Sequence, residues 1–213
     1  MIKQYYTNSR LDIQATLNIE NINSILEIGC ASGVMGEALK MKNKNIFYFG
    51  IDYDIDSLNI ARTRLDQVHL FDFNIDDYNK LDEIILHKFD HIIFADVLEH
   101  LLYPMNIIKY FKKYLKPNGK IIISIPNIAH ISVIKQLFFK LDFHYQDEGI
   151  LDRTHLHFYT KKSFTRELNH LGFNNISYVY NNGLKSNILS KIFGKWVLNY
   201  FSTQIIYIID INE

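Results

Sequence analysis

The stretch Ile25-Leu26-Glu27-Ile28-Gly29-Cys30-Ala31-Ser32-Gly33 decides the fold of this chain. Its apolar first half is typical of a buried strand, and its glycines predict a tight turn before a helix. A second apolar run, 46–51, ends at Asp52, and a strand–turn–helix–strand unit closed by an acid predicts a nucleotide-binding half-fold. A carboxylate there suits a free ribose diol, because it accepts hydrogen bonds from both hydroxyls, and it would repel a 2′-phosphate.

Length and composition limit the class of protein. The chain has 213 residues, of which 48% are hydrophobic, and this predicts a domain with a sizeable core. Acids and bases are balanced at 23 each, so we expect no nucleic-acid partner. The single cysteine, Cys30, cannot form an internal disulfide, and the N-terminus lacks the apolar core of a signal peptide. No apolar run approaches the roughly 20 residues of a membrane span. We therefore expect a soluble, cytoplasmic protein without a membrane span.

Short apolar runs alternate with helix-like segments up to Pro126. The runs are apolar on both faces, which is typical of central parallel strands covered by helices. The predicted strands are Ser24–Ile28, Ile46–Ile51, Val68–Leu70, His91–Ala95 and Lys120–Ile125. The predicted helices lie near Val34–Met41, Ser57–Leu65, Tyr78–His87 and Pro104–Leu115. A turn signal, Lys116-Pro117-Asn118-Gly119, precedes the fifth strand.

After Pro126 the simple alternation ends. We predict a helix over Ala129–Lys140 and then an irregular stretch rich in histidine, aspartate and aromatic residues. The remaining predicted elements are the helix Lys161–Leu171, the strand Asn175–Tyr180, a helix-like segment Leu184–Tyr200 and the strand Gln204–Ile209. The pattern predicts an α/β sandwich with an insertion after the fifth strand and a final strand pair.

Five motifs, in this order and spacing, resemble those of the Rossmann-like S-adenosylmethionine-dependent methyltransferases over nearly the whole chain. They are Leu26–Gly33, Gly50–Asp52, Leu70–Asp72, Phe89–His100 and Leu115–Lys120. Two residues depart from the family pattern, because Ala31 replaces the middle glycine of the first motif and Phe71 replaces the glycine of the third. Segments 124–132 and 149–160 are further similar to a methyltransferase subgroup often associated with glycan and surface-polysaccharide modification.

The resemblance implies an α/β fold, a three-layer α/β/α Rossmann-like methyltransferase sandwich. Its mostly parallel, seven-stranded sheet would have an antiparallel last strand. The whole of 1–213 would be a single methyltransferase domain. Its parts would be an N-terminal lid or helix at 1–22, a cofactor-binding core at 23–126, a substrate-side insertion at 127–160, and C-terminal helices and strands at 161–213.

S-adenosylmethionine is the cofactor that the resemblance implies, with S-adenosylhomocysteine as its product. Gly29 and Gly33 would let backbone N–H groups approach it, and Glu27 would lie near its cationic end. Asp52 would accept the ribose hydroxyls, with a helix cap as the alternative. The other residues expected to contact the cofactor are Cys30, Ala31, Tyr53, Asp72, Phe73, Ala95 and Asp96. Asp72 would accept the adenine amino hydrogen, and Tyr53 or an adjacent phenylalanine would pack on the ring.

Histidines are the candidate general bases, because a neutral imidazole can take a hydroxyl proton at cellular pH. His155 is the first candidate, and His100 and His130 are the others. On an extended strand, His155 and His157 would point the same way. A hydrogen-bonded structural turn is the alternative for the histidines of the insertion.

The segment after the fourth predicted strand also contains candidate metal ligands. Asp96, Glu99 and His100 could loosely hold a magnesium-like ion, as the similar segment of the ubiquinone-type O-methyltransferases can. We favour the alternative, a polar helix start that packs and caps, so no metal is predicted.

Both ends of the chain carry features with two interpretations. Tyr5, Tyr6 and Arg10 could fold over the site as a lid, with Arg10 on the methionine carboxylate, or belong to an ordinary docking helix. The lysine-containing segment Lys185–Tyr200 is expected to cover the sheet, with an amphipathic docking helix as the alternative.

The function expected from these residues is methylation of a hydroxyl on a small-molecule or glycan-linked acceptor. N-methylation and cofactor binding without turnover are the alternatives within the same fold. An NAD-dependent oxidoreductase would need a second glycine where Gly29-Cys30-Ala31 has alanine. A P-loop is excluded because no Gly-Lys-Ser/Thr occurs.

Overall fold

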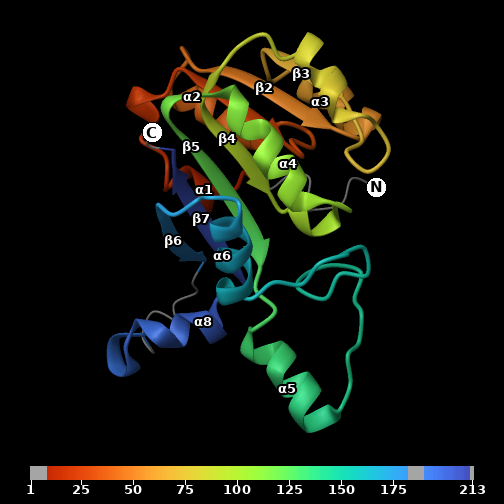
Figure 1. Cartoon of the computed structure of the whole chain (residues 1–213), viewed down its shortest axis with the longest axis vertical. Helices are drawn as coiled ribbons and strands as arrows, with labels where there is room; N and C mark the ends of the chain where they lie inside the picture. The colour runs from red at the N-terminus through yellow and green to blue at the C-terminus, as the bar shows by residue number, and fades with distance from the viewer. Residues whose placement is uncertain (1–8, 182–189, 212–213) are drawn as a thin grey trace.

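A seven-stranded sheet forms the centre of the computed structural model, which describes residues 9–181 and 190–211 (Figure 1). The strand order is β3-β2-β1-β4-β5-β7-β6, and β7 runs antiparallel to both of its neighbours while the other pairs are parallel. The strands are β1 (Ser24–Ile28), β2 (Phe47–Asp52), β3 (Gln67–Leu70), β4 (Phe89–Ala95), β5 (Leu115–Pro126), β6 (Ile176–Asn181) and β7 (Gln204–Asp210). The predicted fold class is therefore confirmed.

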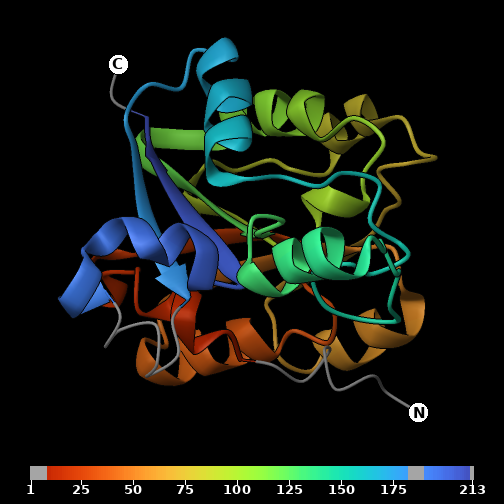
Figure 2. The ribbon, with the colours of Figure 1, turned by 90° about the horizontal axis from the view of Figure 1, so that it is seen from below.

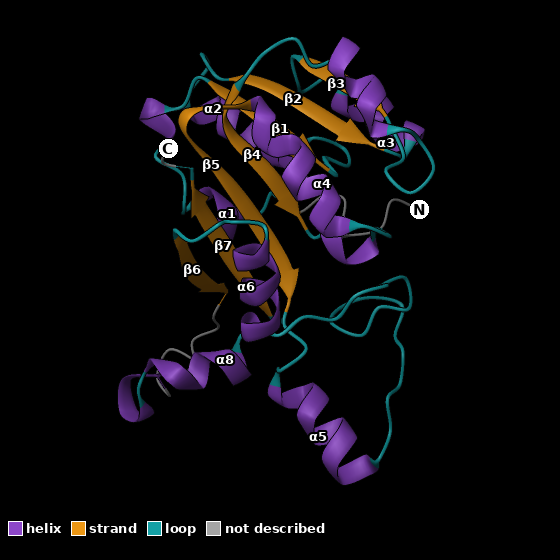
Figure 3. Cartoon of the chain, viewed as in Figure 1, coloured by secondary structure: helices purple, strands orange, loops and turns teal. Residues whose placement is uncertain are grey.

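Helices cover both faces of the sheet and make it the middle of three layers (Figures 2 and 3). The α-helices with defined bounds are α1 (Leu11–Gln14), α2 (Val34–Lys42), α3 (Ile55–Ala61), α4 (Pro104–Phe111), α5 (Ile131–Lys140), α6 (Lys161–His170) and α8 (Leu198–Phe201). The 3-10 helices are η2 (Ile19–Asn21), η3 (Tyr78–Glu83), η4 (Leu98–His100), η5 (Lys112–Tyr114) and η6 (Lys195–Val197). No helix in the described part of the chain has the length and hydrophobicity that crossing a membrane requires.

The first strand shows why these apolar runs occupy the middle of the sheet. All five residues of β1 are buried. Ile25 belongs to the core on the α2 and α3 side, whereas Leu26 belongs to the core under α4 and α6, because successive side chains point to opposite faces. A strand whose side chains are buried on both faces must lie between two helical layers.

One predicted helix and one predicted turn take different forms. The segment predicted as a helix near 78–87 forms only the short 3-10 helix η3. The predicted turn 116–119 lies inside β5 as a bulge. Phe89 pairs with Leu115 and His91 with Lys120, so the additional residues of β5 loop out, and Asn118 takes a left-handed φ of 63°. The strand and the turn signal are therefore both present, because a bulge accommodates the turn without ending the pairing.

The C-terminal helix-like segment can be followed only in part. Residues 182–189 lie outside the described residues, and with them the first residues of the predicted segment 184–200. Its remainder forms a helical turn at 190–193 followed by η6 and α8.

The chain between β5 and α6 leaves the sheet and returns to it. In Figure 1, α5 projects away from the sheet, and the loop after it comes back toward the carboxyl end of β4. The N–H groups of Leu156 and His157 donate to the carbonyl of Glu99 at 2.8 and 3.2 Å. These bonds fasten the returning loop to η4, directly after β4.

Gly50 allows a test of how tightly the first two strands and the turn pack. A Cβ at Gly50 would lie 2.5 Å from Cys30 Sγ and 2.8 Å from a Leu65 methyl group. We expect Gly50→Ala to lower the free energy of unfolding by about 1–3 kcal/mol through overpacking, measured by urea denaturation. Gly50 has no left-handed φ, so its loss of stability would come from packing, whereas Gly172→Ala reports the cost of a left-handed backbone alone, since its φ is +84° and nothing lies within 4 Å of the added Cβ. Wild-type stability of Gly50→Ala would contradict the packing.

Candidate cofactor and acceptor site

The turn after β1 adopts a backbone that carries three left-handed residues. Gly29, Ala31 and Gly33 have φ values of 77°, 45° and 75°. Gly29 N–H and Cys30 N–H both donate to the carbonyl of Ile51, at 2.8 and 3.2 Å. The turn is thus bound to the end of β2. Ala31 adopts a left-handed conformation that a glycine would adopt more easily.

Asp52 completes this attachment from the end of β2. Its Oδ2 accepts the N–H of Ala31 at 2.7 Å, and its Oδ1 accepts the N–H of Asp54 at 2.9 Å. Burial raises the pKa of the carboxyl, while these backbone N–H groups act in the opposite direction. Each oxygen has a second lone pair, so Asp52 can still accept hydroxyl groups. The neighbouring Tyr53 is 65% exposed and is available to pack on a planar ligand.

Glu27 lies in the middle of this region, on β1. The side chain is 4% exposed, and the Tyr48 hydroxyl donates to its Oε2 at 2.7 Å. Burial raises the pKa of Glu27 to about 8, with a smaller contribution from the charge of Asp52. The carboxyl is therefore largely protonated at neutral pH, and a cation placed beside it would favour its ionised form.

The residues expected at the adenine ring lie beyond β3. Asp72 and Phe73 are half-buried, and Asp72 Oδ1 accepts the N–H of Asn74 at 2.9 Å. The Phe73 ring lies 4.8 Å from the Phe71 ring and 5.7 Å from the Phe111 ring. Phe71 is buried in the core, so Phe73 is the phenylalanine of the pair that keeps an accessible surface.

Ala95 and Asp96 end the fourth strand, and a buried cation holds Asp96. Arg10 Nη1 donates to Asp96 Oδ2 at 2.5 Å, and Ser124 Oγ donates to Asp96 Oδ1 at 2.9 Å. The same guanidinium forms two hydrogen bonds of 3.0 Å to Asp12. Of the two interpretations of Arg10, one places it on the methionine carboxylate, and in this structure it bridges Asp12 and Asp96. Tyr5 and Tyr6, the other predicted lid residues, lie outside the described residues.

Three titratable side chains gather where the returning loop meets η4. His155 Nε2 lies 3.9 Å from Glu99 Oε1, and the His100 and His155 rings are 4.7 Å apart. The Nδ1 atom of His155 lies 3.1 Å from the carbonyl of Ile150. Because a carbonyl only accepts, that bond places the proton on Nδ1 and leaves the lone pair of Nε2 directed toward Glu99.

Burial determines the charges of this cluster. Glu99 is 1% exposed, and neither of its carboxylate oxygens has a hydrogen-bond partner among the described residues. Burial, together with the charge of Asp96, raises the pKa of Glu99 well above its usual range. Burial and the nearby His100 lower the pKa of His155. Both shifts favour the uncharged forms, which are a protonated carboxyl group and a neutral imidazole.

The same three side chains fit a divalent cation. Ligand atoms of Glu99, His100 and His155 lie within 4.8 Å of one another. A bound cation would give the partnerless carboxylate a counter-charge, and two imidazoles with a carboxylate suit first-row divalent metals. The set differs from the Asp96, Glu99 and His100 group considered in the sequence, because His155 lies with Glu99 and His100, whereas Asp96 binds Arg10 and Ser124.

The other histidines of the insertion take different places. His130 is the N-cap of α5, where Nδ1 accepts the N–H of Ser132 at 3.3 Å, and burial lowers its pKa. The expectation of one extended strand carrying His155 and His157 is wrong, because residues 155–158 form no strand. His157 instead stacks on Tyr159 with ring centroids 5.9 Å apart. A catalytic role for His130 stays a prediction.

Sequence reasoning missed two side chains that support the site. Tyr48 bonds to Glu27, and Ser124 joins Asp96 to Arg10. A hydroxyl inside an otherwise apolar strand was the only signal available for either residue. Such a hydroxyl needs a partner when buried, but the partner depends on strand register, which the pattern does not contain.

Two solved structures that share this architecture are described as methyltransferases. A SAM-dependent methyltransferase from Archaeoglobus fulgidus superposes with a TM-score of 0.67 and 14% identity, over 95% of this chain and 94% of that one. The plantazolicin methyltransferase BpumL, solved in complex with SAH, gives a TM-score of 0.63 and 15% identity, over 98% of this chain and 84% of that one. At these identities the likeness shows the fold.

The sequence comparison gives the family. A model described as a methyltransferase domain matches residues 5–178, and the chain belongs to this methyltransferase-domain family. It is 33% identical over 125 residues to a ubiquinone biosynthesis O-methyltransferase of Actinobacillus pleuropneumoniae, covering 55% of this chain and 52% of that protein. The relative of the same description in Histophilus somni is 30% identical over 120 residues, covering 54% of this chain and 50% of that protein. The chain thus spans about half the length of these curated relatives. The resemblance to methyltransferases is confirmed, whereas the glycan-modifying subgroup stays a prediction.

The raised pKa of Glu27 predicts a pH dependence of stability. Between the usual value of 4.5 and about 8, the unfolded chain ionises this carboxyl while the folded chain keeps its proton. Unfolding then releases a proton, so in this window Glu27 lowers the free energy of unfolding as pH rises, by at most about 1.4 kcal/mol per pH unit. We expect Glu27→Gln to remove this slope in urea denaturation between pH 5.5 and 7.5.

Glu20→Gln is the matched control, because Glu20 is exposed. A stability difference between wild type and Glu27→Gln that stays constant with pH would contradict the buried, protonated carboxyl.

Proposed function

We propose that the chain is an S-adenosylmethionine-dependent methyltransferase that methylates a hydroxyl group. The left-handed turn 29–33, bound to Asp52 at the carboxyl ends of β1 and β2, is the observation that carries the proposal. Open α/β sheets bind ligands at this edge, and the turn presents backbone rather than side chains to a ligand.

The donor would lie along this edge of the sheet. S-adenosylmethionine supplies an electrophilic methyl group on a sulfonium. Asp52 would hold the ribose hydroxyls with its remaining lone pairs, and Tyr53 or Phe73 would pack on the adenine. Glu27 would face the cationic end of S-adenosylmethionine. The positive charge would favour the ionised carboxylate and so oppose the effect of burial, which raises the pKa. These contacts place the methyl group rather than activate it, because the sulfonium is already reactive.

The acceptor would be activated by the cluster at η4. His155 Nε2 is unprotonated, and the Ile150 carbonyl holds the ring orientation. Nε2 would take the proton of the acceptor hydroxyl while the oxygen forms its bond to the methyl carbon and the carbon–sulfur bond breaks. The products are a methyl ether, S-adenosylhomocysteine and a protonated imidazole. The protonated ring would donate a hydrogen bond from Nε2 to a carboxyl oxygen of Glu99, whose Oε1 lies 3.9 Å from Nε2.

The chemistry of the relatives supports a hydroxyl acceptor. Those compared above are described as O-methyltransferases, at about 30% identity. N-methylation and cofactor binding without turnover remain the competing functions. The proposal includes a glycan-linked acceptor, because segments 124–132 and 149–160 resemble the glycan-modifying subgroup. A divalent cation on Glu99, His100 and His155 would supply another route, because it would lower the pKa of a bound hydroxyl.

Cofactor identity can be tested by thermal stability. S-adenosylhomocysteine should raise the melting temperature by mass action, and at one hundred times its dissociation constant it adds about 2.7 kcal/mol. Asp52→Asn should reduce that shift, whereas Asp56→Asn, at an exposed position in the first turn of α3, should leave it unchanged. Stabilisation by NAD and not by S-adenosylhomocysteine would overturn the proposal.

The role of His155 can be tested by turnover against a panel of phenolic and sugar hydroxyl acceptors, followed by release of S-adenosylhomocysteine. We expect His155→Ala to reduce kcat by about 10²–10⁴ with little change in cofactor affinity, because the base acts on the acceptor. His144→Ala, at an exposed position of the same insertion, is the control. Full turnover by His155→Ala would exclude it as the base. Loss of wild-type turnover on EDTA treatment, restored by a divalent metal, would show that the cluster acts through a cation.

A further inference from the structure

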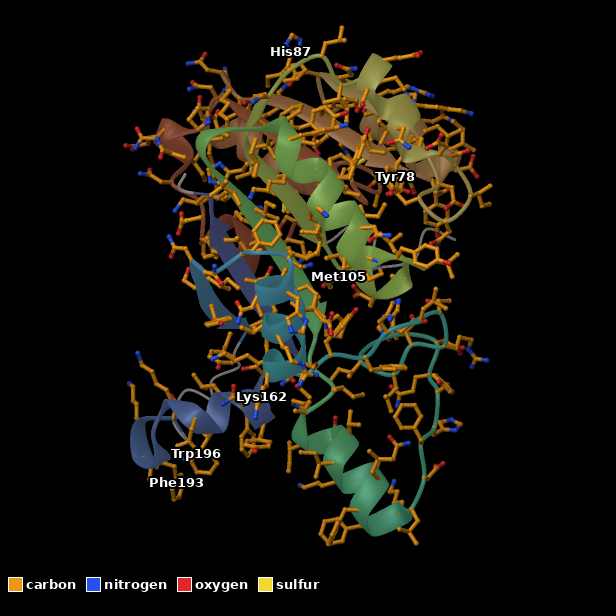
Figure 4. All side chains as sticks on the ribbon, viewed as in Figure 1. Tyr78, His87, Met105, Lys162, Phe193 and Trp196 are labelled. Atoms are coloured by element: carbon orange, nitrogen blue, oxygen red, sulfur yellow. The ribbon has the colours of Figure 1, made fainter. Side chains whose placement is uncertain are left out.

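A cavity that the predicted cofactor residues do not line lies between α6 and the C-terminal helical segment. Its volume is about 860 Å³, within the range of small-molecule sites. α6 supplies one wall, α8 supplies Asn199 and Tyr200, and Asn127 and Ala129 after β5 lie at its base. Figure 4 shows Lys162 at the end of α6 that approaches this segment. None of the cofactor-binding or catalytic residues predicted from the sequence lines this cavity.

The α6 wall carries a row of cationic and polar side chains. Lys162, Arg166 and His170 recur every fourth residue and therefore share one face of the helix. All three are exposed along the cavity, and Lys161 lines it beside them. No aspartate or glutamate is among the described residues that line the cavity, although acids and bases are equal in number over the whole chain. The cavity therefore has a local excess of positive charge.

Hydrogen bonds hold the other walls in place. Asn127 is 1% exposed and donates to the carbonyls of Asn199 and Ser202 at 2.7 and 3.0 Å. The Tyr180 hydroxyl donates to Asn199 Oδ1 at 2.7 Å and accepts from Lys161 Nζ at 3.1 Å. Lys161 is thus fixed within the protein. In contrast, neither Lys162 nor Arg166 forms an ion pair with any carboxylate in the described part of the chain.

We propose that this cavity binds the phosphoryl or diphosphate group of a small molecule, held by Lys162 and Arg166 with His170 at the side. Arginine presents a fork that matches phosphate oxygens, and lysine adds a point charge. The volume exceeds that of a phosphate alone, so the rest of the ligand would lie against Tyr178 and Tyr200. This site does not depend on the proposed methyl transfer.

The cavity borders the acceptor insertion through one continuous set of contacts. Asn127 at its base forms a bridge with Tyr159, Tyr159 stacks on His157, and the N–H of His157 donates to the carbonyl of Glu99. If the methyl transfer proposed above is correct, a phosphoryl group in the cavity would anchor one end of the acceptor. That extension rests on the proposed function, whereas anion binding does not.

Binding can be measured on the full chain without cofactor or acceptor. Inorganic diphosphate is the probe, titrated by calorimetry and by the fluorescence of Trp196, the only tryptophan, whose ring lies 6.1 Å from that of the cavity residue Tyr200. We expect saturable binding, with an affinity at least tenfold lower in Lys162→Gln/Arg166→Gln. The matched control is Lys135→Gln/Lys140→Gln, which removes two exposed charges from α5.

Two further arms identify the source of the phosphoryl group. Vesicles of phosphatidylcholine with and without phosphatidylglycerol present it as a lipid headgroup, and sodium chloride at equal ionic strength tests simple charge screening. Binding of diphosphate or of phosphatidylglycerol vesicles that depends on Lys162 and Arg166 supports the site and assigns its source. No saturable binding to either, or binding that is equal in the two double variants, would overturn it. Methyl transfer would be unaffected by that failure, so the two proposals can fail separately.

Discussion

The hydrogen bond from Ala31 N–H to the Asp52 carboxylate is the constraint on which the cofactor region depends. It closes the turn after β1 against the end of β2, together with the two N–H groups that meet the Ile51 carbonyl. Two of its three left-handed residues are glycines, so the turn held there presents mainly backbone at this edge of the sheet. Because Asp52 uses one lone pair of each oxygen for the backbone, it positions the turn and still has capacity for a ligand.

Several buried acidic residues lie around that edge of the sheet. Glu27, Asp52, Asp96 and Glu99 are all buried, and the fold compensates them in different ways. Asp96 has a guanidinium, Asp52 has backbone N–H groups, and Glu27 and Glu99 have pKa values raised by burial. An unpaired charge buried without a partner would cost several kcal/mol, so protonation is the less costly state for the last two. Ligands that bring positive charge would reverse that preference.

Periodicity identified most of the sheet because its strands are buried on both faces. β1 and β2 are apolar nearly throughout, and this pattern depends only on the layers above and below them. The misplaced elements are those where a local signal has two structural solutions. The turn 116–119 became a bulge within β5, and the segment near 78–87 became a short 3-10 helix. The prediction that His155 and His157 point the same way also failed, because it required a strand that the loop does not form.

The sequence by itself determined the sheet, the glycine turn with Asp52, and the family, because these depend on residues that are close in the chain or repeat with a strand or helix period. The tertiary structure alone decided that Arg10 holds Asp96, that Tyr48 bonds to Glu27 and that His155 joins Glu99 and His100. It also decided that Lys162 and Arg166 of α6 face α8 across a cavity. Each of these contacts joins segments that are far apart along the chain. Strand order and the path of the loops determine which of these segments come into contact, and the spacing of residues along the chain does not specify either.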